Sequence, residues 1–231
     1  MTDQGDLRER ISRFYDDYHR GRLRTPSDWM KTHYWTAFVG RVLEVGGGTL
    51  HPDRADYAVI DLSAEAIKRC HLKAIPGAMA DGAHMPFKDR AFDTAACFDV
   101  LEHVVEPERF ISELCRISAQ RVVIAGPNYI GRHIGGINRY LPLRLLDFWF
   151  GKGCAATRLE NPHLSFDEQW QPDFDAVTAP NAGWVAGQMR RHGFNILHLR
   201  SWELGQAPWF NHFPALRCLG QFMFVVGERR A

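Results

Sequence analysis

The chain lacks the features that mark exported or membrane-spanning proteins. No apolar run among its 231 residues approaches the roughly 20 residues that a spanning helix needs. The opening residues MTDQGDLRER are polar and charged, so they contain no apolar segment of a signal peptide. The five cysteines are scattered without a C-x-x-C pair, which is typical of reduced thiols. The sequence therefore predicts a soluble, cytoplasmic protein without a membrane span.

The chain also lacks a charge of one sign. Its 28 Lys and Arg residues nearly balance 27 Asp and Glu residues, for a formal net charge of +1. No stripe of Lys and Arg stands out, so neither a nucleic acid nor an anionic surface would be attracted by the field of the whole protein. With 45% hydrophobic residues, the composition supports a buried core in a single domain.

What is present is an alternation of strand and helix patterns. Continuous apolar strands separated by helices indicate a parallel sheet that is covered on both faces. The sequence therefore predicts an α/β fold, doubly wound and Rossmann-like, with an N-terminal helical cap. Strands are expected at 41–45, 57–62, 78–80, 92–98, 121–126, 195–202 and 221–229, and helices at 6–19, 27–38, from Ser63, from Pro107 and at 183–192.

One segment breaks this alternation. Residues 129–182 are rich in Gly, Pro, His and aromatic residues and read as an insertion between the fifth strand and the last large helix. We expect a single domain with four parts: a helical cap (1–40), a core (41–128), this insertion, and the end of the core (183–231). Apolar stretches in and after the insertion leave four roles open, namely a lid, the binding of a hydrophobic acceptor, a dimer contact, and shallow seating on a membrane surface.

In the stretch RVLEVGGGTL, the first strand is followed by three consecutive glycines at 46–48, whose main chain carries no side chains. Ligands of open parallel sheets bind beyond the carboxyl ends of the strands. A dinucleotide fingerprint needs a third glycine where this chain has His51, and Pro52 follows. The eight residues 49–56 leave hardly any room for a helix that would hold a pyrophosphate. A ligand without phosphates fits better than a nicotinamide dinucleotide.

Three acids accompany the glycines. Glu44, Asp61 and Asp81 lie in or directly after three successive strands, whose ends meet at one edge of a parallel sheet. A carboxylate there can accept both hydroxyls of a ribose, and another can meet an adenine edge. Together with the glycines, the acids predict a nucleoside-shaped pocket.

The motifs resemble class I S-adenosylmethionine-dependent methyltransferases, in particular their small-molecule, type 11-like branch. Four blocks carry the resemblance: VLEVGGGT, VIDLS, DGAHMPFKDRAFDTAACFDVLEHV and RVVIAGPN. It implies S-adenosylmethionine as cofactor and a seven-stranded sheet whose last strand is antiparallel. Leu50, where relatives commonly have a further glycine, departs from the pattern.

The resemblance also implies contacts for each part of the cofactor. The methionine end falls to Glu44 and the glycine loop, and the ribose to Asp61 with Leu62. The adenine amino group falls to Asp81, with main chain supplied by Gly82 and Ala83, and the sulfonium side to Asp99. Tyr15 of the N-terminal helix is expected to reach the cofactor or merely to pack. The cofactor residues so predicted are Glu44, Gly46, Gly47, Gly48, Asp61, Leu62, Asp81, Gly82, Ala83, Asp99 and Tyr15.

The expected reaction moves a methyl group to a small-molecule acceptor, foremost a hydroxyl of a sugar, a lipid-linked molecule or a secondary metabolite. A hydroxyl needs a general base, and His133 and His163 of the insertion are the candidates. No metal is expected, because His163 with its acidic neighbours fits no ligand spacing. Methylation of nitrogen or carbon, and a non-catalytic cofactor-binding partner, stay open as alternatives, as do a monomer and a homodimer.

Overall fold

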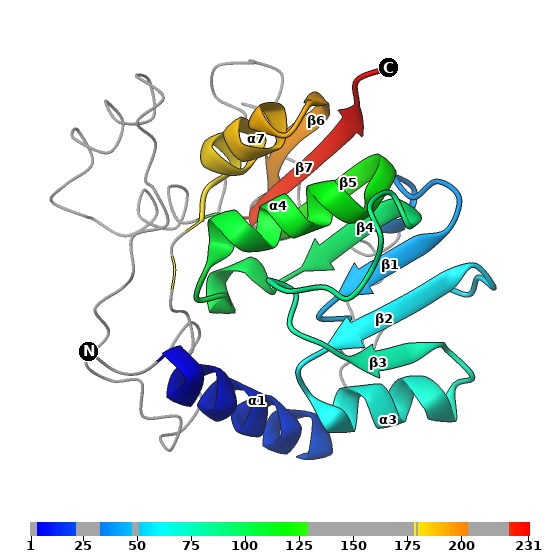
Figure 1. The fold of residues 1–231 in the computed structure, drawn as a ribbon, viewed down its shortest axis with the longest axis vertical. Coiled ribbons are helices and arrows are strands. Elements are labelled where there is room, and N and C mark those ends of the chain that lie inside the picture. Colours follow the sequence, from blue (N-terminus) through cyan, green and yellow to red (C-terminus); the bar gives the residue numbers. More distant parts are fainter. Residues whose placement is uncertain (1–3, 22–32, 48–50, 129–177, 179, 203–221) are drawn as a thin grey trace, which may run out of the picture.

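A seven-stranded sheet forms the centre of the molecule (Figure 1). The computed structural model describes residues 4–21, 33–47, 51–128, 178, 180–202 and 222–231. The strands are β1 (Val42–Val45), β2 (Tyr57–Asp61), β3 (Gly77–Met79), β4 (Phe92–Phe98), β5 (Ser118–Pro127), β6 (Phe194–Trp202) and β7 (Phe222–Arg229). Around them lie α1 (Gln4–Gly21), α3 (Ala64–Leu72), the short 3-10 helix η1 (Leu101–His103), α4 (Pro107–Ile117) and α7 (Ala182–Arg191).

The strand order is β3-β2-β1-β4-β5-β7-β6. Strands β1 to β5 are mutually parallel, and β7 is antiparallel to both β5 and β6, so β7 alone runs against the other six. The order reverses between β1 and β4, which is where open parallel sheets bind their ligands. The predicted fold class is therefore confirmed, including the antiparallel last strand.

Two apolar clusters, one on each face, hold helices against the sheet. On one face, the helices α4 and α7 bury side chains such as Phe110, Leu114 and Met189. On the other face, α3 buries Ile67 beside Tyr34 and Phe38, which precede β1. Residues 51–56 contain no helix, as expected of so short a connection, and the aromatic residues before β1 help to cover that face.

The predicted helix boundaries follow from local signals. Ser63 caps α3 by accepting a hydrogen bond from the amide of Ala66, and Pro107 is the first residue of α4. The helix α7 ends at Arg191, two residues before Gly193, whose φ is +84°. Helix α1 is slightly longer than predicted. Residues 27–32, the first half of the second predicted helix, lie outside the described residues, and residues 33–35 are helical.

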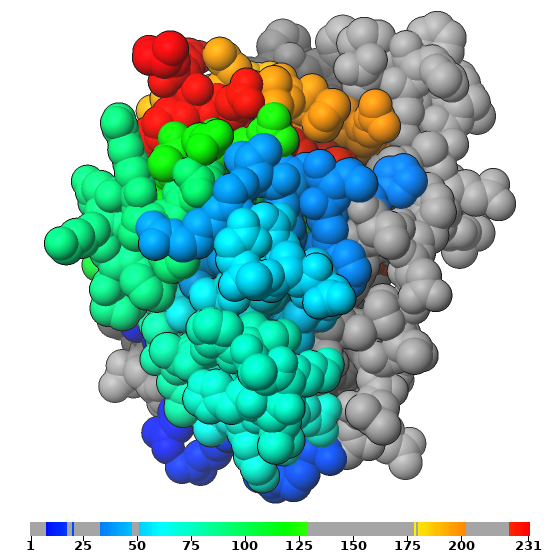
Figure 2. All heavy atoms as spheres, turned by 90° about the vertical axis from the view of Figure 1, so that its right-hand side faces the viewer, coloured from blue at the N-terminus to red at the C-terminus, as the bar shows by residue number. Residues whose placement is uncertain are grey.

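Helix α1 lies on the side to which the parallel strands point (Figure 1). In the view from the right-hand side of Figure 1, residues 33–47 and 51–128 form the blue-to-green part of the surface, and α1 shows at the lower rim (Figure 2). No helix within the described ranges is both long and apolar enough to cross a bilayer.

Candidate cofactor site

The glycine loop begins directly at the end of β1. Gly46 has a φ of +72°, and its amide donates to the carbonyl of Ile60 at 2.8 Å, which ties the loop to β2. A Cβ on Gly46 would lie 2.3 Å from Val100 Cγ2, and one on Gly47 would lie 2.8 Å from Val59 Cγ1. Neither backbone position has room for a side chain. Gly48, the third predicted glycine, lies outside the described residues.

Glu44 lies beneath this loop rather than open to solvent. Glu44 is only 1% exposed, and its carboxylate accepts a hydrogen bond from the hydroxyl of Tyr57 in β2. Burial, and then the neighbouring carboxylate of Glu44, raise the pKa of Tyr57 well above its usual range, so the phenol stays a donor. A Cβ on Gly47 would be 3.6 Å from Glu44 Oε1. The buried Glu44 side chain therefore lies next to the glycine loop. Tyr57, which the sequence motifs did not indicate, holds that side chain in place.

Tyr57→Phe is expected to lower the free energy of unfolding by about 2 kcal/mol, because it deprives a buried carboxylate of a donor. Urea denaturation measures the change. Tyr34→Phe is the matched control: Tyr34 is also buried, but its hydroxyl has no hydrogen-bond partner among the described residues. Equal stability losses in the two variants would contradict the role given to the Tyr57 hydrogen bond.

Asp61 ends β2 at the same edge of the sheet. Its Oδ1 accepts the amide of Ser63 at 2.8 Å, which fixes the carboxylate as the chain turns into α3. Asp61 is half-buried, and a carboxylate offers about four acceptor positions, so a ligand with two neighbouring hydroxyls suits it. Leu62 contributes its carbonyl, which accepts the hydroxyl of Ser12 in α1 at 2.9 Å.

Asp81 follows β3 and is held by its own loop. Its Oδ1 accepts the amide of Ala83 at 2.8 Å, and its Oδ2 lies 3.1 Å from Nδ1 of His84. Gly82, between Asp81 and Ala83, is buried, and a Cβ there would lie 2.3 Å from Phe110 Cε2 of α4. The loop thus packs against α4 through bare main chain while its carboxylate remains partly exposed.

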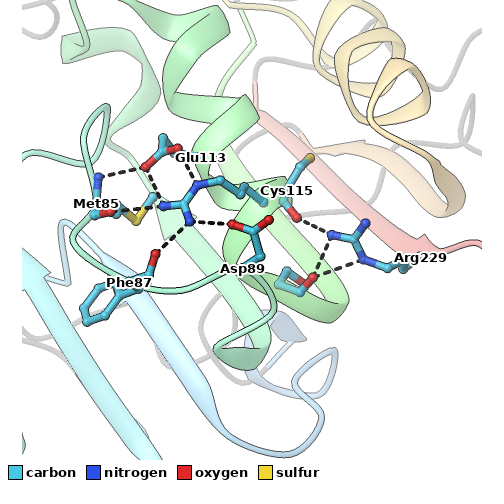
Figure 3. Close-up of polar contacts among 8 residues, drawn as sticks. Met85, Phe87, Asp89, Glu113, Cys115 and Arg229 are labelled. Carbon is cyan, nitrogen blue, oxygen red and sulfur yellow. Dashed lines mark hydrogen bonds and ion pairs between the residues drawn. The ribbon is translucent and has the colours of Figure 1, made fainter.

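Helix α4 fastens the rest of this loop. Glu113 Oε2 accepts the amide of Met85 at 2.8 Å, and Arg116 donates to the carbonyls of Met85 at 3.0 Å and Phe87 at 2.7 Å (Figure 3). The Arg116 hydrogen bonds hold the pKa of Glu113 below its usual range. These charge-assisted contacts give the loop that follows β3 a fixed position against the helix.

Asp99 and Tyr15 lie at the exit of β4. Asp99 is exposed, has a φ of +55°, and its amide donates to the carbonyl of Ala125 at 3.0 Å. The ring of Tyr15 packs edge-on against His103 of η1, with 5.5 Å between the centroids. Tyr15 therefore packs at this edge of the sheet; its contact with a cofactor stays a prediction. The candidate bases, His133 and His163, lie outside the described residues.

A polar stripe on α1 was not predicted. Arg8, Ser12 and Asp16 follow one another at intervals of four residues, so they share a helix face. Arg8 forms ion pairs with Asp81 and Glu106, Ser12 reaches the carbonyl of Leu62, and Asp16 Oδ1 accepts the hydroxyl of Ser63 at 2.7 Å. The four-residue spacing beside the apolar Ile11 and Tyr15 was the available signal. Helix α1 thus spans the exits of β2, β3 and β4.

The arrangement places carboxylate acceptors beside the glycine loop. Gly46 and Asp81 follow β1 and β3, and Asp61 ends the adjacent strand β2, so the three share one edge of the sheet beside the reversal of strand order. The helix whose N-terminus would receive a pyrophosphate is missing from the described residues after the loop, 51–56. Carboxylates accept hydroxyl and amino protons, whereas they would repel phosphate.

Comparisons with known proteins agree with this geometry. Residues 43–124 match the family described as "Methyltransferase domain". A phosphatidylethanolamine N-methyltransferase of Cereibacter sphaeroides is 31% identical over 109 residues, which cover 42% of this chain and 54% of the relative. The chain thus spans about half the length of that curated relative.

Solved structures share the fold at low identity. An S-adenosylmethionine-dependent methyltransferase from Mesorhizobium loti is 15% identical with a TM-score of 0.58, covering 88% of this chain and 99% of that one. The cyclase SpnF is 13% identical with a TM-score of 0.57, covering 98% and 95%. S-adenosylmethionine, the cofactor predicted from the sequence, agrees with the family match. Residues 43–124 of the chain therefore match a methyltransferase domain in sequence, and the chain has the fold of S-adenosylmethionine-dependent methyltransferases.

Proposed function

We propose that the chain transfers the methyl group of S-adenosylmethionine to a small-molecule acceptor. The observation that carries the proposal is the meeting of Gly46, Asp61 and Asp81 at one edge of the sheet. The main chain at Gly46 and Gly47 admits the methionine end, Asp61 accepts the ribose hydroxyls, and Asp81 with the main chain of Gly82 and Ala83 meets the adenine. Asp99 lies on the sulfonium side, at the exit of β4.

The reaction is an in-line displacement. A lone pair of the acceptor attacks the methyl carbon, the bond between that carbon and sulfur breaks, and its electron pair neutralises the sulfonium to give S-adenosylhomocysteine. Holding the two molecules in line can supply roughly 7 to 11 kcal/mol of the barrier. A hydroxyl acceptor must also lose its proton, for which we propose His133 or His163 as the base. An amine that is already neutral needs no base before it attacks.

For the acceptor, we propose a lipid-linked molecule. This class was among the acceptors expected from the sequence, and the phosphatidylethanolamine N-methyltransferase of Cereibacter sphaeroides supports it. That relative favours a phospholipid amine as the second candidate beside the hydroxyl acceptors. With a lipid acceptor of either kind, amine or hydroxyl, the protein would contact a membrane surface. Because the cyclase SpnF shares the fold, the fold alone does not set the reaction.

Two measurements test the proposal. Calorimetric titration with S-adenosylhomocysteine is expected to give one saturable site, and no binding at high micromolar ligand would remove the central claim. Transfer from methyl-labelled cofactor is then followed into vesicles of phosphatidylethanolamine in phosphatidylcholine, vesicles of phosphatidylglycerol in phosphatidylcholine, and phosphatidylcholine alone. Label in the first supports the amine, label in the second supports a hydroxyl, and phosphatidylcholine is the blank.

Other outcomes would contradict the proposed acceptor, the proposed catalysis or the proposed cofactor. Binding without transfer to either lipid would overturn the lipid-linked acceptor, and binding without turnover on sugars and hydroxylated metabolites as well would favour the non-catalytic alternative. If NAD but not S-adenosylhomocysteine raises the melting temperature, the site binds a nicotinamide dinucleotide instead.

A further inference from the structure

Arg8 of α1 joins two acids that belong to different loops. Its Nε lies 3.3 Å from Asp81 Oδ2 after β3, and its Nη2 donates to Glu106 Oε2 at the start of α4. All three side chains are 27 to 30% exposed, so solvent only partly screens the pairs. A guanidinium can bridge two carboxylates with its donors fixed in one plane, which an ammonium cannot do.

The contacts of Asp81 determine what it can still accept. Oδ1 is bound to the amide of Ala83, whereas Oδ2 faces both His84 and Arg8. Each carboxylate oxygen has two lone pairs, so Oδ1 keeps one acceptor position beside the Ala83 main chain. With Oδ2 engaged by Arg8, the carboxylate cannot rotate freely, and this acceptor position is fixed.

We infer that Arg8 is a positioning residue that orients Asp81 to accept the amino group of the adenine, so that docking of α1 contributes to recognition of the base. The inference rests on the proposed function, because it assigns the adenine to Asp81. Arg8 acts through Asp81 and needs no contact of its own with the cofactor. Helix α1 is then part of the cofactor site and does more than cover it.

The test compares S-adenosylhomocysteine with its deaminated analogue, in which hypoxanthine replaces adenine and the amino group is lost. Calorimetry on the full chain is expected to show tighter binding of the adenine form. Arg8→Ala should weaken that form about tenfold, the effect of one misplaced charge-assisted contact, and leave the analogue nearly unchanged. Arg8→Lys should restore part of the preference, since it returns the charge without the planar fork.

Two variants on the same helix separate positioning from docking. Ser12→Ala removes the bond to the Leu62 carbonyl, on the ribose side of the site, and leaves the Arg8–Asp81 pair in place, so it should affect both ligands equally. Arg13→Ala removes only an exposed pair with Glu9 and should change nothing. If Arg8→Ala weakens both ligands alike, as Ser12→Ala does, Arg8 merely docks the helix and the inference is wrong.

A double-mutant cycle gives the independent check. Because Arg8 acts through Asp81, Arg8→Ala should have little further effect on binding in an Asp81→Ala background, whereas unrelated contributions would add. Additive losses would overturn the inference. Absence of S-adenosylhomocysteine binding by the unmodified chain would instead overturn the proposed function, so the two failures are distinguishable.

Discussion

Asp61→Asn is expected to raise the dissociation constant of S-adenosylhomocysteine about 100-fold. Two ribose hydroxyls each donate to the carboxylate in the proposed complex, and a hydrogen bond to a charged group contributes roughly 1.5 kcal/mol, so about 3 kcal/mol is lost. The asparagine oxygen can still accept the amide of Ser63, so the turn into α3 is preserved. Isothermal titration calorimetry measures the change.

The same strand provides the control. Asp56 lies just before β2, at the other end of that strand, where it pairs with Arg54. Asp56→Asn should therefore leave binding unchanged. A ligand analogue without the two ribose hydroxyls should bind the unmodified chain and Asp61→Asn with similar affinity. If Asp61→Asn binds S-adenosylhomocysteine as tightly as the unmodified chain, the ribose assignment is wrong.

Gly46→Ala is expected to lower the free energy of unfolding by about 3 kcal/mol. About 1 kcal/mol comes from placing a Cβ in the left-handed region, where φ is +72°. About 2 kcal/mol comes from overlap, because the new Cβ would lie 2.3 Å from Val100 Cγ2. Urea denaturation measures the loss, and cofactor affinity should fall with it because the loop must shift.

A cycle with Val100→Ala divides the two contributions. In the Val100→Ala background most of the overlap is relieved, since only the Val100 Cβ, 3.3 Å from the new Cβ, remains nearby, so Gly46→Ala should cost little more than about 1 kcal/mol there. Gly187→Ala is the control, because Gly187 lies within α7 and nothing stands within 4 Å of its Cβ position. That change should be neutral or stabilising. A loss at Gly46 no greater than that at Gly187 would remove the argument for a required glycine.

The docking of helix α1 is expected to affect binding of the cofactor. Its contacts with Leu62, Ser63 and Asp81 all involve residues that directly follow strands of the candidate site. A ligand held at these residues lies next to α1, so association is expected to depend on how firmly the helix docks. The variants at Arg8 and Ser12 probe that dependence from two sides.

The sequence by itself determined what depends on local physics. Apolar strands alternating with helices set the parallel sheet, and Ser63 and Pro107 set the starts of α3 and α4. The positions of Asp61 and Asp81 at one edge also followed, because parallel strands end on the same side of a sheet. Their binding roles, like those of His133 and His163, stay predictions.

The tertiary structure alone decided which distant residues meet. Arg8 pairs with Glu106 across 98 positions of the chain, and no helical period encodes that partner. The hydroxyl of Tyr57 reaches Glu44 only because β2 pairs with β1 in the observed register, with Tyr57 opposite Val42. Contacts of this kind depend on how helices and strands pack, and packing is a property of the assembled core rather than of any single segment.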